Sequence, residues 1–503
     1  MGILDNLILG FNVAVSLNNL FFCFVGVFIG TLIGVLPGIG PVATISLLLP
    51  VSFGMDPVTS IIMLCGVYYG AMYGGSTTSI LVNIPGEAAS IATCLDGYQM
   101  ARNGRAGPAL GMSAFGSFIG GTVSIIGLML LAPLLASYAL KFGPPEYFAL
   151  MFFGLTMVTY LCMGSVLKGL IMAAAGIAVS TVGQDPISGV TRFTVGSITL
   201  MDGFGIVPAA MGIFGIGEVL TNIEQVIKQE VFSSRIKGLL PTTKDWVDCK
   251  WPIVRGSLIG FFMGILPGAG TVIPTFMAYA AEKKLSRHPE KFGTGVIEGV
   301  AAPETANNAA TGGSLVTLLS LGIPANVVMA VLLGAFIIHG IQPGPLLMTK
   351  HPDLFWGTIV SMYIGNIMLV ILNLPLIGIW VRILKVPYNV LFPLILIFCF
   401  LGVYSLNNNL YEVVIMVCFG VFGYLIRKFD YEGAPFLLGM VLGPMFETAF
   451  RQSLIYGDPL IFFRRPITAV LLGVSIFLLI TPFFPTIRLK RKELEKTLED
   501  DLQ

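Results

Sequence analysis

Two segments far apart in the sequence repeat a Pro-Gly-x-Gly pattern, Pro37-Gly38-Ile39-Gly40-Pro41 and Pro267-Gly268-Ala269-Gly270-Thr271. Glycine permits sharp turns and proline donates no backbone hydrogen bond, so such segments leave backbone N–H and carbonyl groups free. Helices that begin at Pro41 and Thr271 would direct N–H groups at an anion, while free carbonyls could hold a small cation. The alternative interpretation is that these glycines only permit close helix packing.

Hydroxyl and amide side chains gather around a second repeated pattern, Gly74-Gly75-Ser76 and Gly312-Gly313-Ser314. Such side chains bind carboxylate oxygens or Na⁺ without burying a full charge, although many membrane Ser and Thr residues serve packing alone. The two patterns predict substrate- or ion-binding residues in both halves of the chain, namely Gly38, Gly40, Pro41, Ser76, Thr77, Asn83, Gly268, Gly270, Thr271, Asn307, Asn308 and Ser314.

Two carboxylates close to the second Gly-Gly-Ser pattern, Glu298 and Glu304, are candidates for carrying a coupling proton or Na⁺. The alternative is an interfacial position at the start of a helix. No Walker A loop, HExxH, GxSxG or nucleophile with a His partner is present, so the sequence predicts neither an enzyme nor a cofactor. The only small ligand expected besides the substrate is Na⁺ or H⁺.

The composition predicts a protein that is surrounded mostly by lipid. Of 503 residues, 55% are hydrophobic and only 11% are charged, with a mean hydropathy of +0.88. Long continuous apolar runs such as 107–140, 147–182 and 354–383 favour helices over a barrel, whose strands alternate. We expect an all-α integral membrane protein with about 10 to 12 transmembrane helices. A net charge of +1 without a basic patch excludes nucleic acid as a partner.

The repeated patterns occur in the same order, which predicts two homologous halves. The first half is 1–222, with a broken or re-entrant hairpin around 24–55 and the Gly-Gly-Ser segment around 66–86. A polar linker, 223–251, leads to the second half, 252–487, with its hairpin around 256–281 and its Gly-Gly-Ser segment around 294–324. The charged tail is 488–503.

The distribution of cations predicts that the two halves are inverted. Arg102 is the first Lys or Arg, so the first tip has no cation on either flank, whereas the second has Lys228–Arg255 before it and Lys283–Lys291 after it. Short cytoplasmic loops are rich in Lys and Arg, which puts the linker and the tail in the cytoplasm. Only 26 residues, 256–281, separate the cation-rich flanks, too few for two crossings. A re-entrant hairpin is expected; a kinked single span is the alternative.

Four longer motifs resemble the large membrane (permease) subunit of the tripartite tricarboxylate transporters. They are 34–41, 73–76 with 83–87, 302–308, and 184–189 with Arg192-Phe193. The resemblance implies a bacterial inner-membrane protein that works with a small four-span membrane subunit and a periplasmic solute-binding protein. It also implies import of citrate-like carboxylates driven by an ion gradient, with an elevator-like movement.

The charge of such a substrate bears on how transport is driven. A citrate carries up to three negative charges, and the candidate segments contain no Lys or Arg to offset them. We therefore expect cation symport, with Na⁺ favoured over H⁺ because the candidate ligands are carbonyl, hydroxyl and amide oxygens. An anion channel, or a non-transporting membrane scaffold that docks a periplasmic partner, is the alternative function.

Overall fold

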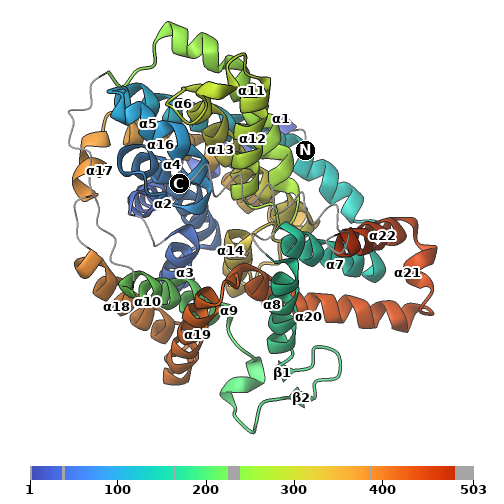
Figure 1. Ribbon diagram of the computed structural model, residues 1–503. Helices are drawn as coiled ribbons and strands as arrows, with labels where there is room; N and C mark the ends of the chain where they lie inside the picture. Colours follow the sequence, from blue (N-terminus) through green and yellow to red (C-terminus); the bar gives the residue numbers. More distant parts are fainter. Residues whose placement is uncertain (1–2, 37–39, 162–164, 225–237, 385–387, 482–503) are drawn as a thin grey trace.

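The computed structural model describes residues 3–36, 40–161, 165–224, 238–384 and 388–481, and nearly all of these are helical (Figure 1). The first half contains α1 (Ile3–Ala14), α2 (Leu17–Val35), α3 (Gly40–Phe53), α4 (Pro57–Val82), η1 (Ala88–Ser90), α5 (Ile91–Arg102), α6 (Ala106–Ala139), α7 (Pro144–Leu161), α8 (Val166–Ser180), β1 (Gly183–Gln184), β2 (Thr191–Arg192), η2 (Thr199–Asp202), α9 (Ile206–Ala210), η3 (Met211–Ile216) and α10 (Gly217–Glu224). The strands β1 and β2 form a small antiparallel hairpin.

The second half contains α11 (Thr243–Ile265), α12 (Val272–Leu285), η4 (Pro289–Lys291), α13 (Glu298–Leu321), α14 (Val327–Ile338), α15 (Leu347–Lys350), α16 (Pro352–Asn373), α17 (Ile377–Ile383), α18 (Tyr388–Asn407), α19 (Leu410–Lys428), α20 (Gly433–Tyr456), α21 (Ile461–Arg464) and α22 (Pro466–Ile480). In the described chain, seven helices are long and apolar enough to cross a membrane, and six further apolar helices are shorter. The prediction of an all-α integral membrane protein is confirmed.

Helices α2 and α4 run parallel and touch backbone to backbone. Glycines 26, 30 and 34 of α2 face the carbonyls of residues 63, 67 and 71 of α4, and a Cβ added at Gly30 would lie 2.4 Å from the Val67 oxygen. At the starts of these helices, Thr59 donates a hydrogen bond to Asn19. Because α3 ends at Phe53, just before α4 begins, α2 and α3 form a hairpin that enters and leaves at one end.

The second half repeats this packing. Glycines 256, 260 and 264 of α11 face the carbonyls of residues 302, 306 and 310 of α13. The spacing along both helices is the same as in the first half, four residues for each contact. An ion pair between Arg255 of α11 and Glu282 of α12 joins the outer parts of these two helices, with Nε and Oε1 2.5 Å apart. Helices α11 and α12 therefore also form a hairpin whose ends lie together.

The two helices that support the hairpins, α4 and α13, run in opposite directions. Ser76, late in α4, donates to Glu304, early in α13, whereas Tyr68, earlier in α4, accepts from Asn326, which follows the end of α13. Since α2 is parallel to α4 and α11 to α13, the two hairpins approach each other from opposite ends of the molecule.

The glycine contacts give a stability prediction. Replacing Gly30 or Gly260 with Val should destabilise the fold by about 1–3 kcal/mol or more, because the added atoms overlap main-chain carbonyls that cannot move aside. Thermal unfolding in detergent measures this loss. Gly54→Ala is the matched control, since nothing lies within 4 Å of the added Cβ at that position. Equal melting temperatures for all three variants would contradict the packing described here.

Candidate substrate site

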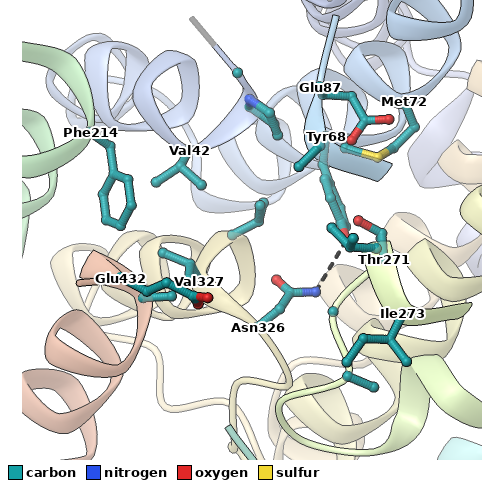
Figure 2. A pocket seen from close by; sticks show the side chains of 18 of the residues that line it. Val42, Tyr68, Met72, Glu87, Phe214, Thr271, Ile273, Asn326, Val327 and Glu432 are labelled. Carbon is teal, nitrogen blue, oxygen red and sulfur yellow. Dashed lines mark hydrogen bonds between the residues drawn. The ribbon is translucent and has the colours of Figure 1, made fainter. Parts of the chain in front are cut away.

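The start of α3 and the tip of the α11–α12 hairpin meet at a cavity of about 660 Å³, referred to here as the central cavity (Figure 2). Its walls come from both halves of the chain. Besides the hairpins, α4, α7, η3, α10 and α20 contribute residues. The walls consist of Gly40, Pro41, Val42, Tyr68, Met72, Pro85, Gly86, Glu87, Ala88, Ile91, Val158, Phe214, Glu218, Gly268, Ala269, Gly270, Thr271, Val272, Ile273, Asn326, Val327, Val328, Glu432, Ala434 and Leu438. This volume is in the range of small-molecule sites.

Several helices begin at the wall of the central cavity. The starts of α3, α12 and α14 all line it, as does the short helix η1, which leads directly into α5. Free N–H groups and the helix dipole make a helix N-terminus attractive to an anion. Thr271, at the start of α12, makes no side-chain capping hydrogen bond, so the N–H groups of this turn have no capping side chain. The cavity thus combines several partial positive charges.

The second tip is fixed in place by its backbone. The N–H of Gly268 donates to the Ala325 carbonyl over 2.7 Å, which ties the tip of the α11–α12 hairpin to the turn before α14. Gly268 and Gly270 have φ values of 90° and 57°, in the left-handed region that favours glycine, and Gly40 at the other tip has φ 64°. These glycines permit the turns that bring the starts of α3 and α12 to the cavity.

Carboxylates are the charged side chains of the central cavity. Glu87, Glu218 and Glu432 line it, and no Lys or Arg is among the described lining residues. Glu218 forms an ion pair with Arg427, outside the cavity wall. Glu87 accepts hydrogen bonds from the N–H of Ala89 and from the amide of Asn307. An anion in this cavity would therefore lie close to carboxylates.

Glu87 and Asn326 occupy equivalent positions in the two halves. Each follows an Ile-Pro pair by two residues and precedes a helix that begins at the cavity. The Glu87 side chain accepts from the N–H of Ala89, and that of Asn326 accepts from the N–H of Met329. Asn326 also donates to the Tyr68 hydroxyl (Figure 2). Neither residue was among the predicted binding residues, although the matching Ile84-Pro85 and Ile323-Pro324 pairs precede them.

Five of the predicted residues line the central cavity: Gly40, Pro41, Gly268, Gly270 and Thr271. They come from both tips, so the structure brings together segments that are more than 200 residues apart in the chain. Gly38 is outside the described residues. Side chains that the sequence analysis did not select complete the wall, above all Glu87, Asn326 and Tyr68.

Two further predicted residues, Ser76 and Glu304, contact each other outside the cavity wall. This carboxylate is fully buried and accepts hydrogen bonds from Ser76, Thr93 and Ser117. Three residues further along α13, Asn307 donates to Glu87 over 3.1 Å, and the buried Oδ1 of Asn307 has no hydrogen-bond partner. Asn307 thus lies between the Glu304 cluster and the central cavity, and its free oxygen could accept from, or coordinate, a further group.

The other predicted residues lie outside the cavity wall. Thr77 is buried within α4, and Asn83 is exposed where it ends this helix with a left-handed backbone, φ 58°. Asn308 and Ser314 make hydrogen bonds within α13, to the carbonyls of Glu304 and Thr311. Glu298 begins α13 and is partly buried.

The segment 184–193, part of the family resemblance, forms the β-hairpin and its ion pairs. Arg192 pairs with Glu447 of α20 through both guanidinium nitrogens, at 2.8 and 3.1 Å, and Arg451 pairs with Asp185 at 2.6 Å. The backbone N–H of Ser188 and the guanidinium of Arg451 hold the pKa of Asp185 well below its usual range. These contacts attach the hairpin to α20.

The fold and the site define a polytopic helical membrane protein with two interrupted hairpins around one small-molecule cavity. Residues 20–438 match the tripartite tricarboxylate transporter TctA family, and the chain belongs to this family. It is a subunit of a membrane transport system.

Two proteins of Agrobacterium vitis are similar to this chain. An uncharacterized 52.8 kDa protein in the TAR-I ttuC' 3' region is 50% identical over 493 residues, which is 98% of each chain. An uncharacterized protein in the TAR-II ttuC' 3' region is 50% identical over 244 residues, 48% of this chain and 100% of the relative. No solved structure matches.

The two glycines of the second tip should respond differently to substitution. A Cβ at Gly268 would lie 2.4 Å from the Val158 nitrogen, whereas nothing lies within 4 Å of one at Gly270. Asn adopts the left-handed backbone more readily than other residues with side chains. Gly268→Ala should therefore lower the melting temperature of the protein in detergent, while Gly270→Asn should change it little. Similar melting temperatures for both variants would show that the close contact with α7 is unimportant.

Proposed function

We propose that this chain is the translocating subunit for a carboxylate substrate, citrate-like in chemistry, and that the central cavity is the substrate site. The observation that carries the proposal is the convergence of the starts of α3, α12 and α14 on one cavity between two interrupted hairpins. Broken helices whose N-termini point at an anion near the membrane centre are the usual construction of substrate sites in secondary transporters.

The proposal includes an inverted repeat. The matching glycine contacts in α2–α4 and α11–α13, and the opposite directions of α4 and α13, support it. One end of the molecule is rich in Lys and Arg, and by the positive-inside rule it would be cytoplasmic. Its cations include Arg102, Lys244, Lys283 and Lys284. The first hairpin would then enter from outside and the second from inside.

Cation symport follows from the charges around the site. A di- or tricarboxylate in a cavity that already contains Glu87 and Glu432 would face repulsion and desolvation together. Coupled cations would offset this charge. Na⁺ is favoured over H⁺ because backbone carbonyls at the tips, and hydroxyl and amide oxygens around Glu304, are its preferred ligands. Glu304 is the stronger of the two candidate coupling carboxylates, since Glu298 lies at a helix start.

The partners proposed are a small four-span membrane subunit and a periplasmic solute-binding protein that delivers the carboxylate, in a bacterial inner membrane. Tripartite systems of this family act through several subunits. An elevator-like movement agrees with the packing. Because the glycine contacts fix each hairpin to its supporting helix, α2–α4 and α11–α13 would move as rigid units.

The function is tested with proteoliposomes that contain all three components. Uptake of radiolabelled citrate is measured with an inward Na⁺ gradient, and then with choline in place of Na⁺ while a pH gradient is held constant. We expect uptake with Na⁺ and at least a tenfold loss with choline. Uptake that survives the exchange would assign coupling to H⁺. Uptake that equilibrates without any gradient and without the binding protein would identify a channel.

Substitution of Glu304 tests whether this carboxylate takes part in coupling. Glu304→Gln preserves the side-chain volume but removes the charge that Ser76, Thr93 and Ser117 surround. We expect concentrative uptake to be lost while the protein still inserts and remains folded, because the coupling cation has lost its carboxylate. Glu298→Gln is the matched control and should retain most of the uptake. Normal Na⁺-driven accumulation by Glu304→Gln would remove Glu304 from the coupling mechanism.

A further inference from the structure

A second cavity, of about 820 Å³, lies at the other end of α7 and α20 from the central cavity. Its wall is formed by the end of α6, the starts of α7 and α15, and the later part of α20, together with the loop 340–346. This loop is held against the end of α13, since a Cβ at Gly322 would lie 2.5 Å from the Pro343 oxygen. We refer to this cavity as the vestibule.

The charges of the vestibule are opposite to those of the central cavity. Lys350 and His351 line the vestibule, and no Asp or Glu is among its described lining residues. The nearest carboxylate on α7, Glu146, is buried and paired with Arg465 at 3.2 Å. Gln342 and Gln452 add amide donors to the same wall. An anion therefore meets a cation and neutral donors here, whereas carboxylates line the central cavity.

The position of the vestibule follows from α6. This helix begins beside the Arg105–Asp245 ion pair, at the end rich in Lys and Arg, and its last residue, Ala139, lines the vestibule. Its 34 residues span about 50 Å, so the vestibule lies at the opposite end of the molecule. Figure 1 shows α5, α11 and α12 together at the first of these ends. With the proposed topology, the vestibule is on the outer side.

A thin layer separates the two cavities. On α7, Met151 lines the vestibule and Val158 lines the central cavity, and seven residues of helix correspond to about 10 Å. Gly154 lies between them. A Cβ at Gly154 would be 3.5 Å from Pro267 of the second tip and 4.0 Å from Ile323. The tip of the α11–α12 hairpin thus lies between the two cavities, next to Gly154 of α7.

We propose that the vestibule is a second anion-binding site for the transported carboxylate, with Lys350 attracting its charge before the substrate passes Gly154 into the central cavity. The proposal rests on the proposed function and adds the route and the capturing residue. Lys350 is exposed and forms no ion pair with the described residues, so its charge is available to a ligand.

The first experiment compares two lysines at the same end of the molecule. Lys350→Gln should raise the KM for citrate uptake about two- to fivefold, the range for an exposed charge pair, with little change in kcat. Lys141→Gln is the matched control, because Lys141 lies over the Tyr138 ring and does not line the vestibule. The difference should shrink at high ionic strength. Equal KM values for the two variants would overturn the proposal.

The second experiment uses Gly154 to separate binding from passage. Gly154→Ala makes only ordinary contacts and should transport normally, whereas Gly154→Leu should stop uptake by filling the layer against Pro267. Equilibrium binding of radiolabelled citrate to the purified complex should persist in Gly154→Leu and fall severalfold when Lys350→Gln is added. If citrate binding is the same with and without Lys350→Gln, the vestibule site is overturned but the proposed function is not. A wild-type complex that takes up no carboxylate would contradict the proposed function, and this proposal with it.

Discussion

The fold depends on main-chain contact at glycine between each hairpin and its supporting helix. In a membrane, close approach of two helices replaces the hydrophobic driving force that water would provide, and only small residues permit it. Gly26, Gly30 and Gly34 bring α2 against α4, and the same spacing on α11 does so against α13. This contact allows a helix to stop midway, because the interrupted chain is held by its neighbour.

Interrupted helices have a consequence for electrostatics. Backbone groups that are not paired within a helix must meet water, protein or a ligand inside the membrane. In this chain the starts of α3 and α12 both line the central cavity. Helix N-termini provide partial positive charge without a lysine or arginine, which would be expensive to bury and difficult to release from an anion. The same wall also contains the carboxylates Glu87, Glu218 and Glu432.

Much of this arrangement could be predicted from the sequence because it depends on rare, local patterns. The hydrophobic runs led to the helical membrane fold, and the duplicated Pro-Gly-x-Gly segments led to five residues of the cavity wall. Side-chain direction was less accessible. Ser76 and Asn307 lie in the right helices but point to Glu304 and Glu87, and no local pattern specifies which face of α4 or α13 meets which neighbour.

Glu87 illustrates the remaining gap. In the sequence it follows a turn signal, Asn83-Ile84-Pro85-Gly86, and is typical of an exposed loop. In the structure that turn is folded into the protein, and a Cβ at Gly86 would lie 2.0 Å from the Gly34 oxygen. Comparison of the halves beyond the Gly-Gly-Ser pattern would have aligned Glu87 with Asn326 and directed attention to both.

The most direct measurement is a cryo-EM density map of the assembled transporter with a bound carboxylate. We expect ligand density in the central cavity, in contact with N–H groups at the starts of α3 and α12 and within reach of Asn326. Ligand density elsewhere in the protein, with Gly40 and Gly270 in a dry helix contact, would contradict this expectation.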